Sequence, residues 1–191
     1  KGVLIMSVQG YQDYFRNRAR VWERQSLTRA RFVAGDPAVG EKFLKAAHDF
    51  VYRPKLEYGS LIEISRLRER MEMELAQESQ KGKNVKLGFG GLADIEFAVQ
   101  ILQMMHGFRH PRLRITNMTE LLKQMASYGI VDQAELEQVG KYYLCLRNIE
   151  CALRISGRQS TNYLPEDADT LASMAKLLGY REKDREGQAG K

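Results

Sequence analysis

The segment from residue 92 to residue 106 constrains the fold of this chain more than any other. Ten of its fifteen residues are apolar, which is more than the single face that a surface helix buries. We therefore expect a helix over 91–106 that is covered on most sides and lies near the centre of the fold. Its polar residues Glu96, Gln100 and Gln103 fall on one narrow stripe, which we expect to face solvent or to pair with arginines of another helix.

The rest of the chain also has mainly helical periodicity. Apolar residues recur at helical spacing from Tyr11 to Val33, so one helix is expected from Ser7 to Gly35. Further helices are expected to begin at the N-cap Asp36, at capping-box patterns that start with Ser60, Asn117 and Asp132, and at Pro165. The fold class that follows is all-α, a helical bundle, with a short extended run at 3–6.

Composition and charge exclude several kinds of protein. Hydrophobic residues are 43% and charged residues 28%, as in a typical soluble globular protein, and every apolar run ends before the 18 residues of a membrane span. The net charge of +6 would allow a nucleic acid or an acidic partner, but the excess is modest and spread along the chain, and the lack of a recognised nucleic-acid motif argues against nucleic acid. Cys145 and Cys151 match no disulfide or CxxC pattern, so we expect reduced core thiols in a cytoplasmic protein.

A cluster of glycines precedes the apolar helix. Gly88, Gly90 and Gly91 stand close together, and Lys86 adds a positive charge, so the backbone could offer N–H groups to a phosphate. The spacing is neither that of a P-loop nor that of a dinucleotide fingerprint, and a structural turn at a close helix crossing is the favoured interpretation. Asp94 and Glu96 diverge by about 200° on a helix, so they are not expected to share a metal.

A second dense segment is basic. On one continuous helix Arg18, Trp22, Gln25 and Arg29 would align, with Arg31 beside them, and an aromatic ring among arginines suits a phosphate-rich or acidic partner. The alternative, a solvated basic face with Trp22 as a core anchor, is favoured on general grounds.

No catalytic or metal-binding residue can be assigned within this chain. The pair Asp167 and Asp169 resembles a DxD metal motif, but it falls in the first turn of an expected helix, where acids are favoured anyway. Three scattered histidines form no metal site, and no nucleophile is placed beside a base.

The stretch "VKLGFGGLADIEFAVQILQMMHG" (85–107) closely resembles the "KLGPGG…DIEF.VQ.LQL.HG" block of glutamine synthetase adenylyltransferase, the bifunctional adenylylating and adenylyl-removing enzyme. Phe89 stands where that family commonly has proline. The resemblance continues through "WERQSLTRARFVAGD" (22–36), "HPRLRITNMTELLKQMASYGIV" (110–131), "YYLCLRNIECALRI" (142–155) and "LPEDADTLASMAKLLGY" (164–180).

This resemblance implies a helical domain that follows a nucleotidyltransferase domain. Residues 1–8 would be the end of that upstream α/β domain, 9–180 the helical domain with a possible break near 78–84, and 181–191 a frayed tail. The full enzyme would use Mg²⁺ and ATP to transfer AMP to a tyrosine of glutamine synthetase, with the signal protein PII as a regulator. The catalytic acids would lie upstream, so this chain alone would bind no cofactor and would be inactive.

The resemblance also suggests which half of the enzyme this is. The sequence "LADIEF" (92–97) looks more like the C-terminal, adenylylating half than the N-terminal, adenylyl-removing half. Lys86, Gly88, Gly90 and Gly91 are expected to shape the seam with the catalytic domain or to lie on its nucleotide side. Asp94 and Glu96 are expected to anchor that seam through arginines. The adenylyl-removing half, or a basic helical module that binds nucleic acid, remain the alternatives.

Overall fold

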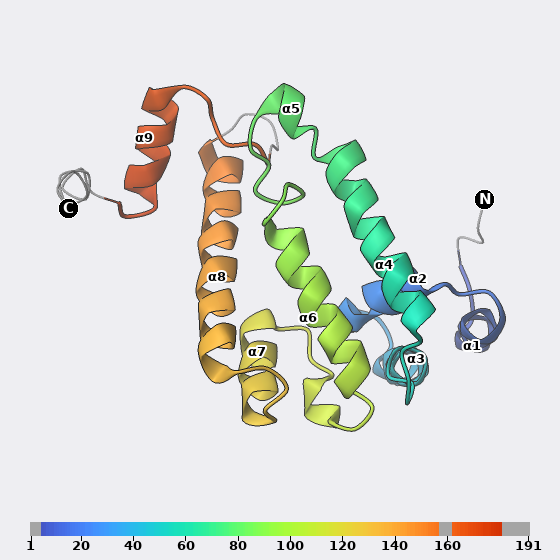
Figure 1. Ribbon diagram of the computed structural model, residues 1–191. Coiled ribbons are helices and arrows are strands. Elements are labelled where there is room, and N and C mark those ends of the chain that lie inside the picture. The colour runs from blue at the N-terminus through green and yellow to red at the C-terminus, as the bar shows by residue number, and fades with distance from the viewer. Residues whose placement is uncertain (1–4, 157–161, 181–191) are drawn as a thin grey trace. The chain divides into compact units, whose positions relative to one another are not determined.

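The computed structural model describes residues 5–156 and 162–180, and these residues are mainly helical, as the sequence predicted (Figure 1). Across these ranges the only β pairing is an isolated bridge between Asn84 and Tyr163. The helices are α1 (Val8–Asn17), α2 (Val21–Ser26), α3 (Pro37–Val51), α4 (Tyr58–Arg70), α5 (Glu78–Lys81), α6 (Leu92–His106), α7 (Met118–Ser127), α8 (Gln133–Ser156) and α9 (Ala168–Leu177). Short 3-10 turns cover Leu27–Arg29 and Pro111–Leu113, and a π turn, Met71–Leu75, continues α4.

Two expectations concern the ends of the chain. Ile5 and Met6, the second half of the expected extended run, lie in no strand, and α1 begins two residues later. Residues 3 and 4 lie outside the described residues, as does the tail at 181–191.

The described residues fall into two compact units. The first unit comprises residues 5–67 and 96–137, and the second comprises 68–95, 138–156 and 162–180. The domain boundaries expected at residues 8, 78–84 and 180 stay predictions.

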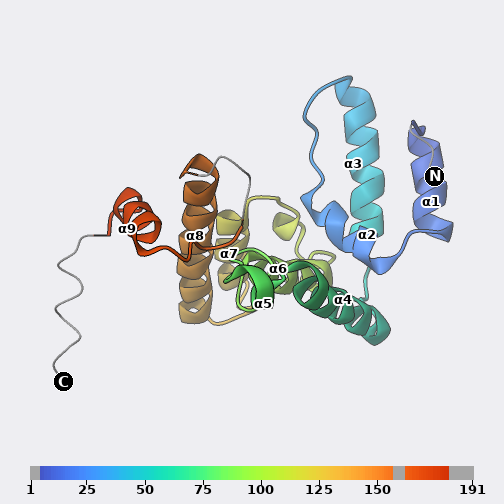
Figure 2. The same cartoon turned by 90° about the horizontal axis from the view of Figure 1, so that it is seen from above.

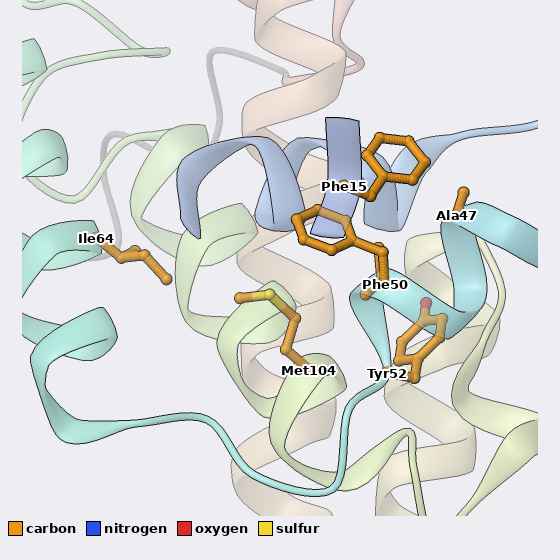
Figure 3. Packing of buried hydrophobic residues seen from close by; sticks show 7 residues of the cluster. Phe15, Ala47, Phe50, Tyr52, Ile64 and Met104 are labelled. Atoms are coloured by element: carbon orange, nitrogen blue, oxygen red, sulfur yellow. The ribbon is translucent and has the colours of Figure 1, made fainter. Parts of the chain in front are cut away.

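The core of the first unit is built where helices far apart in the sequence meet. In Figure 2, α1 and α3 lie side by side, and their aromatic residues Phe15 and Phe50 stack with ring centroids 4.9 Å apart. Figure 3 shows these two rings with the other buried side chains of the cluster, which are Ala47, Val51, Tyr52, Ile64 and Met104. Helix α6 supplies Met104, which is fully buried, so this part of the helix lies in the core, as predicted.

The polar stripe of α6 is buried rather than solvated at two of its three positions. The side-chain amide of Gln25 donates to Gln100 Oε1 over 2.9 Å, and both side chains are buried. Gln103 Nε2 donates to the carbonyls of Leu113 and Ile115 at 2.6 and 2.8 Å. The expectation of solvent or arginine contacts is therefore wrong for Gln100 and Gln103. An uncharged amide can be buried when its hydrogen bonds are made inside the protein.

Arg24 is a buried cation in the same unit. Its Nε donates to the carbonyl of Val51 over 2.7 Å, and Nη1 donates to Lys55 O over 3.4 Å. Val51 is the last residue of α3, so the guanidinium lies where the helix dipole favours a positive charge. Burial, with the charge of Arg53 as a smaller cause, lowers the pKa of Arg24 to about 10.

The expected helix from Ser7 to Gly35 is wrong, because it is broken into short pieces. Helix α1 ends at Asn17, and Glu23 accepts the backbone N–H of Arg20 over 2.8 Å, which starts α2. Tyr14 donates its hydroxyl to the same carboxylate, so a tertiary contact holds the break.

The other expected helix starts are partly correct. The caps at Asp36, Asn117 and Asp132 are confirmed, since each carboxylate or amide oxygen accepts N–H groups of the first turn. Ser60 is not a cap, because α4 begins two residues earlier. Pro165 does not begin the last helix, which starts at Ala168 with Asp167 as its cap.

The second unit has a smaller apolar core. Ala152 and Leu153 of α8 pack with Met174 of α9 and with Val85, and Figure 1 shows the two helices beside each other. Cys145 and Cys151 are free thiols on the exposed side of α8. The expectation that they are core thiols is wrong, because Ala152 and Leu153 occupy the buried side of the helix.

Adjacent methionines provide a test of the core of the first unit. Met104 is fully buried, whereas Met105 is 43% exposed. We expect Met104→Ala to lower the free energy of unfolding by about 2–5 kcal/mol, because it leaves a cavity. Met105→Ala, with the same change in helix propensity, should cost less than about 1 kcal/mol. Denaturant unfolding of both variants measures the difference, and equal losses would contradict the packing described here.

Candidate functional site

Lys86, Gly88, Gly90 and Gly91, which the sequence singled out, lie in a tight turn that precedes α6, residues 84–91, which we name the glycine turn. It lies in the second unit and is organised by Asn84, whose side chain is buried. Asn84 Oδ1 accepts the backbone N–H groups of Lys86 and Leu87 at 3.1 and 2.9 Å, as in an Asx turn. Its own N–H donates to Glu78 Oε1 over 2.9 Å, so the entry to the turn is tied to α5.

The backbone N–H groups of the glycine turn are largely used inside the protein. Beyond the two that Asn84 accepts, Gly90 N donates to Asp94 Oδ2 over 2.7 Å. The remaining bonds run from Gly88 to Asn84 O, from Gly91 to Gly88 O and from Leu92 to Val85 O, at 2.9 to 3.0 Å. A phosphate cradle needs N–H groups that are free to point at the anion. The geometry therefore favours the structural turn over the phosphate cradle.

The glycines are needed for space and for backbone conformation. A Cβ at Gly88 would overlap the Glu78 carboxylate and would lie 2.6 Å from the carbonyl oxygen of Asn84. A Cβ at Gly91 would lie 2.9–3.0 Å from the carbonyl oxygens of Gly88, Lys86 and Val85. Gly90 has a φ of +73°, in the left-handed region that favours glycine.

A buried arginine closes the turn. Arg68, at the end of α4, has a side chain that is 9% exposed, and its Nη2 donates to the carbonyls of Leu87 and Gly88, both at 3.1 Å. Its Nε lies 2.7 Å from Asp94 Oδ1, and Glu72 lies farther away at 3.7 Å. Asp94 therefore joins the guanidinium to the N–H of Gly90 and to the first turn of α6.

Glu96 has a different partner. Its carboxylate lies 2.9 Å from Arg29 Nη1, and both residues belong to the first unit. Asp94 and Glu96 thus pair with two different arginines, in agreement with their divergence on the helix. Arginine partners for both acids were expected from the sequence, but Arg68 was not singled out there. Arg68 follows the buried Ile64 by four residues on α4, so the two side chains lie on the same face of the helix. A charged residue on this buried face was the signal in the sequence that could have identified Arg68.

The residues of the expected basic face do not share a helix. Arg18 lies beyond the end of α1, Trp22 is 45% exposed on α2, and Arg29 lies on a 3-10 turn. Arg31 lines an open groove of about 440 Å³ in the first unit, together with Tyr11, Phe32, Val39 and Phe43. The prediction that these residues align on one helical face is therefore wrong, because α1 and α2 are separate helices. A binding role for these residues stays a prediction.

Metal-binding groups were sought in the part of the chain that the structure describes. There, no three His, Cys, Asp or Glu side chains are grouped so that they could hold a metal ion. Asp167, in the DxD-like pair, caps α9 and accepts the backbone N–H of Thr170 over 2.7 Å. Hydrogen bonding by the Thr170 side chain, and then by this N–H, lowers the pKa of Asp167. None of the described helices has the length and hydropathy needed to span a membrane.

Comparison with known proteins gives this arrangement a family. A family model described as GlnD PII-uridylyltransferase matches residues 63–190, and one described as glutamate-ammonia ligase adenylyltransferase matches residues 1–46. The chain is 32% identical over 94% of its length to the bifunctional glutamine synthetase adenylyltransferase/adenylyl-removing enzyme of Hahella chejuensis. It is 33% identical, over 94% of its length, to the enzymes of that name from Rhizobium meliloti and Bartonella quintana.

Both matching models are named for nucleotidyltransferases. The chain belongs to the family that the GlnD PII-uridylyltransferase model describes, and it is homologous to the bifunctional glutamine synthetase adenylyltransferase/adenylyl-removing enzymes. It spans about a fifth of the length of these relatives, 18% of the first two and 19% of the third.

The two acids of α6 are expected to differ in their contribution to stability. Asp94→Ala leaves the buried guanidinium of Arg68 with a distant partner and frees the N–H of Gly90, so we expect a loss of about 3 kcal/mol. Glu96→Ala removes a pair whose arginine is 52% exposed and should cost less than about 1 kcal/mol. Denaturant unfolding decides, with Glu74→Ala, which breaks an exposed pair with Arg70, as the control. Equal values for Asp94→Ala and Glu74→Ala would show that Asp94 is no anchor.

The close contacts of Gly88 lead to a second prediction. We expect Gly88→Ala to lower the free energy of unfolding by about 1–3 kcal/mol, because the backbone oxygen of Asn84 cannot move away cheaply. Gly59, in α4, has open space at its Cβ position, so Gly59→Ala should be neutral or slightly stabilising. Thermal unfolding of the two variants tests this, and a Gly88→Ala protein as stable as the parent would refute the described turn.

Proposed function

We propose that this chain is the helical domain of an enzyme that transfers AMP from ATP to a tyrosine of glutamine synthetase and thereby regulates nitrogen assimilation in the cytoplasm. The observation that carries the proposal is the likeness over 94% of the chain to enzymes named for this activity. The match of residues 1–46 to the glutamate-ammonia ligase adenylyltransferase model supports it. Residues 1–8 would be the end of an upstream nucleotidyltransferase domain.

The adenylylating half is preferred over the adenylyl-removing half. The preference depends on "LADIEF" (92–97), which resembles the C-terminal half of the family. In the structure, the acids of this motif are those that pair with Arg68 and Arg29. The same motif therefore has a structural role, and the phosphorolytic removal of AMP is the alternative activity.

The chemistry itself is assigned to the upstream domain. In the proposed reaction the tyrosine oxygen would form a bond to the α-phosphorus of ATP and lose its proton to a base or to water, while the bond to the leaving pyrophosphate breaks. Mg²⁺ held by carboxylates of the upstream domain would supply charge stabilisation there. The described residues of this chain do not fit such a metal, because they contain no suitable group of acids. We therefore expect the isolated chain to be inactive.

The glycine turn is the surface that we assign to the seam with the catalytic domain. Its backbone is closed by internal hydrogen bonds, yet Phe89 at its tip is 85% exposed. A large apolar side chain held out on a tightly bonded turn is suited to packing against another domain. Glutamine synthetase and the signal protein PII are the proposed partners of the full enzyme.

The activity test uses the longer natural polypeptide, with the upstream domain attached. With ATP, Mg²⁺ and unmodified glutamine synthetase, we expect incorporation of labelled AMP into the synthetase, and the 191-residue chain alone should incorporate none. Release of AMP from adenylylated synthetase by phosphate, without incorporation, would assign the chain to the other half. The absence of both activities in the longer polypeptide would contradict the proposal, and so would incorporation of AMP by the chain alone.

The seam is tested by changing its exposed aromatic side chain. We expect Phe89→Ala to reduce AMP transfer by the longer polypeptide at least about tenfold, the loss typical of a buried contact of this size. The same substitution should leave the unfolding of the isolated chain unchanged, because Phe89 is exposed there. Tyr58→Ala, which removes another exposed aromatic residue (76% exposed), is the control. Unaltered transfer by the Phe89 variant would remove the turn from the seam.

A further inference from the structure

A buried carboxylate in the second unit is surrounded by three cations. The side chain of Glu150, on α8, is 1% exposed, and Arg147 Nη1 donates to its Oε2. Arg154 Nη2 donates to Oε1 over 2.7 Å, and Lys86 Nζ lies 3.7 Å from the same oxygen. In the described ranges no other Asp or Glu pairs with any of the three cations. The cluster therefore has two positive charges more than negative ones.

The three cations keep much of their surface in solvent. Their side chains are 42% exposed for Lys86, 40% for Arg147 and 50% for Arg154. A guanidinium has five N–H donors and an ammonium has three, so a single shared carboxylate uses only part of this donor capacity. The cluster thus offers donors to solvent while its buried acid holds the side chains in place.

The backbone on both sides of the cluster is fixed. Lys86 lies in the glycine turn, where its N–H donates to Asn84 and its carbonyl accepts the N–H of Ala93 over 2.9 Å. The other three residues follow a spacing of three and four along α8, so they lie on one side of that helix. Ala152 and Leu153, on another side, anchor the helix in the core of the second unit. Little ordering of the backbone is needed before an anion binds.

We propose that this cluster is a binding site for a phosphate dianion, either inorganic phosphate or the terminal phosphate of a nucleotide. An excess of two positive charges matches a group that carries −1.5 to −2 at neutral pH, and a single carboxylate would neutralise only half of it. Two guanidinium groups supply the planar donor pairs that bind phosphate oxygens. The site uses side chains and not the amides of the glycine turn, and it does not depend on the proposed adenylyl transfer.

The test is a titration of the 191-residue chain with inorganic phosphate at constant ionic strength, followed by NMR. We expect saturable shifts at the Lys86 amide and at the Nε–H signals of Arg147 and Arg154. Lys86→Gln should weaken phosphate binding by about fivefold, since it removes one nearby charge at a partly exposed site. Lys83→Gln is the matched control, because Lys83 lies on the same segment and pairs with Glu78 instead. It should leave the affinity unchanged.

Two further measurements complete the test. Arg154→Gln should weaken phosphate binding more than Lys86→Gln, and a thermal melt shows whether each variant remains folded. A titration with ADP identifies the source of the phosphate. If ADP binds more tightly than inorganic phosphate and Lys86→Gln abolishes this binding, the natural ligand is a nucleotide. If ADP and inorganic phosphate bind equally tightly, the ligand is free phosphate. The proposal would be overturned if phosphate caused no saturable shift, or if the Lys83 and Lys86 substitutions weakened phosphate binding equally. It would also be overturned if acetate bound as tightly as phosphate.

Discussion

The geometry of the glycine turn depends on the contacts that the buried guanidinium of Arg68 makes with it. The side chain of Arg68 is 9% exposed, and a cation removed from water costs several kcal/mol unless it is paired and hydrogen-bonded. Two carbonyls of the turn accept hydrogen bonds from Nη2, and the carboxylate of Asp94 pairs with the charge, whereas Nη1 is buried without a hydrogen-bond partner. Because the glycine turn and the N-terminal turn of α6 both supply partners to the Arg68 guanidinium, this guanidinium fixes their positions relative to each other.

The internal hydrogen bonds of the glycine turn limit what the turn can bind. The N–H groups that a phosphate-binding loop would present are directed to Asn84, Asp94 and carbonyls within the turn. What the turn offers outward is side chains, with Phe89 exposed at its tip and Lys86 beside the buried Glu150. Contact with another domain and binding of an anion would therefore both be made by side chains that a rigid backbone holds out.

Local patterns in the sequence predicted the features that local physics decides. The apolar excess of 92–106 predicted a core helix, and Asn117 and Asp132 predicted helix starts, because a cap involves residues only three apart. The family was also predicted, since the motif around Asp94 is long and specific. Each of these signals is complete within a short stretch of chain.

Features that need distant partners were missed. The break between α1 and α2 depends on Tyr14 reaching Glu23, and helical periodicity alone does not reveal it. Arg68 meets carbonyls about twenty residues away, and Glu150 meets Lys86 on another segment, so neither cluster is visible as a spacing. The exposed Cys145 and Cys151 were placed in the core because cysteine is commonly buried, while the arrangement of α8 depends on its packing in the folded chain.

Amide hydrogen exchange of the glycine turn tests the central claim most directly. The account predicts slow exchange for the amides of Lys86, Leu87, Gly88, Gly90, Gly91 and Leu92 in the ligand-free chain, because each donates to an internal acceptor. In Arg68→Met these amides should lose protection, while those of Phe50 and Val51, in the core of the first unit, keep it. Exchange of the turn at the rate of an unfolded peptide in the unaltered chain would contradict the account.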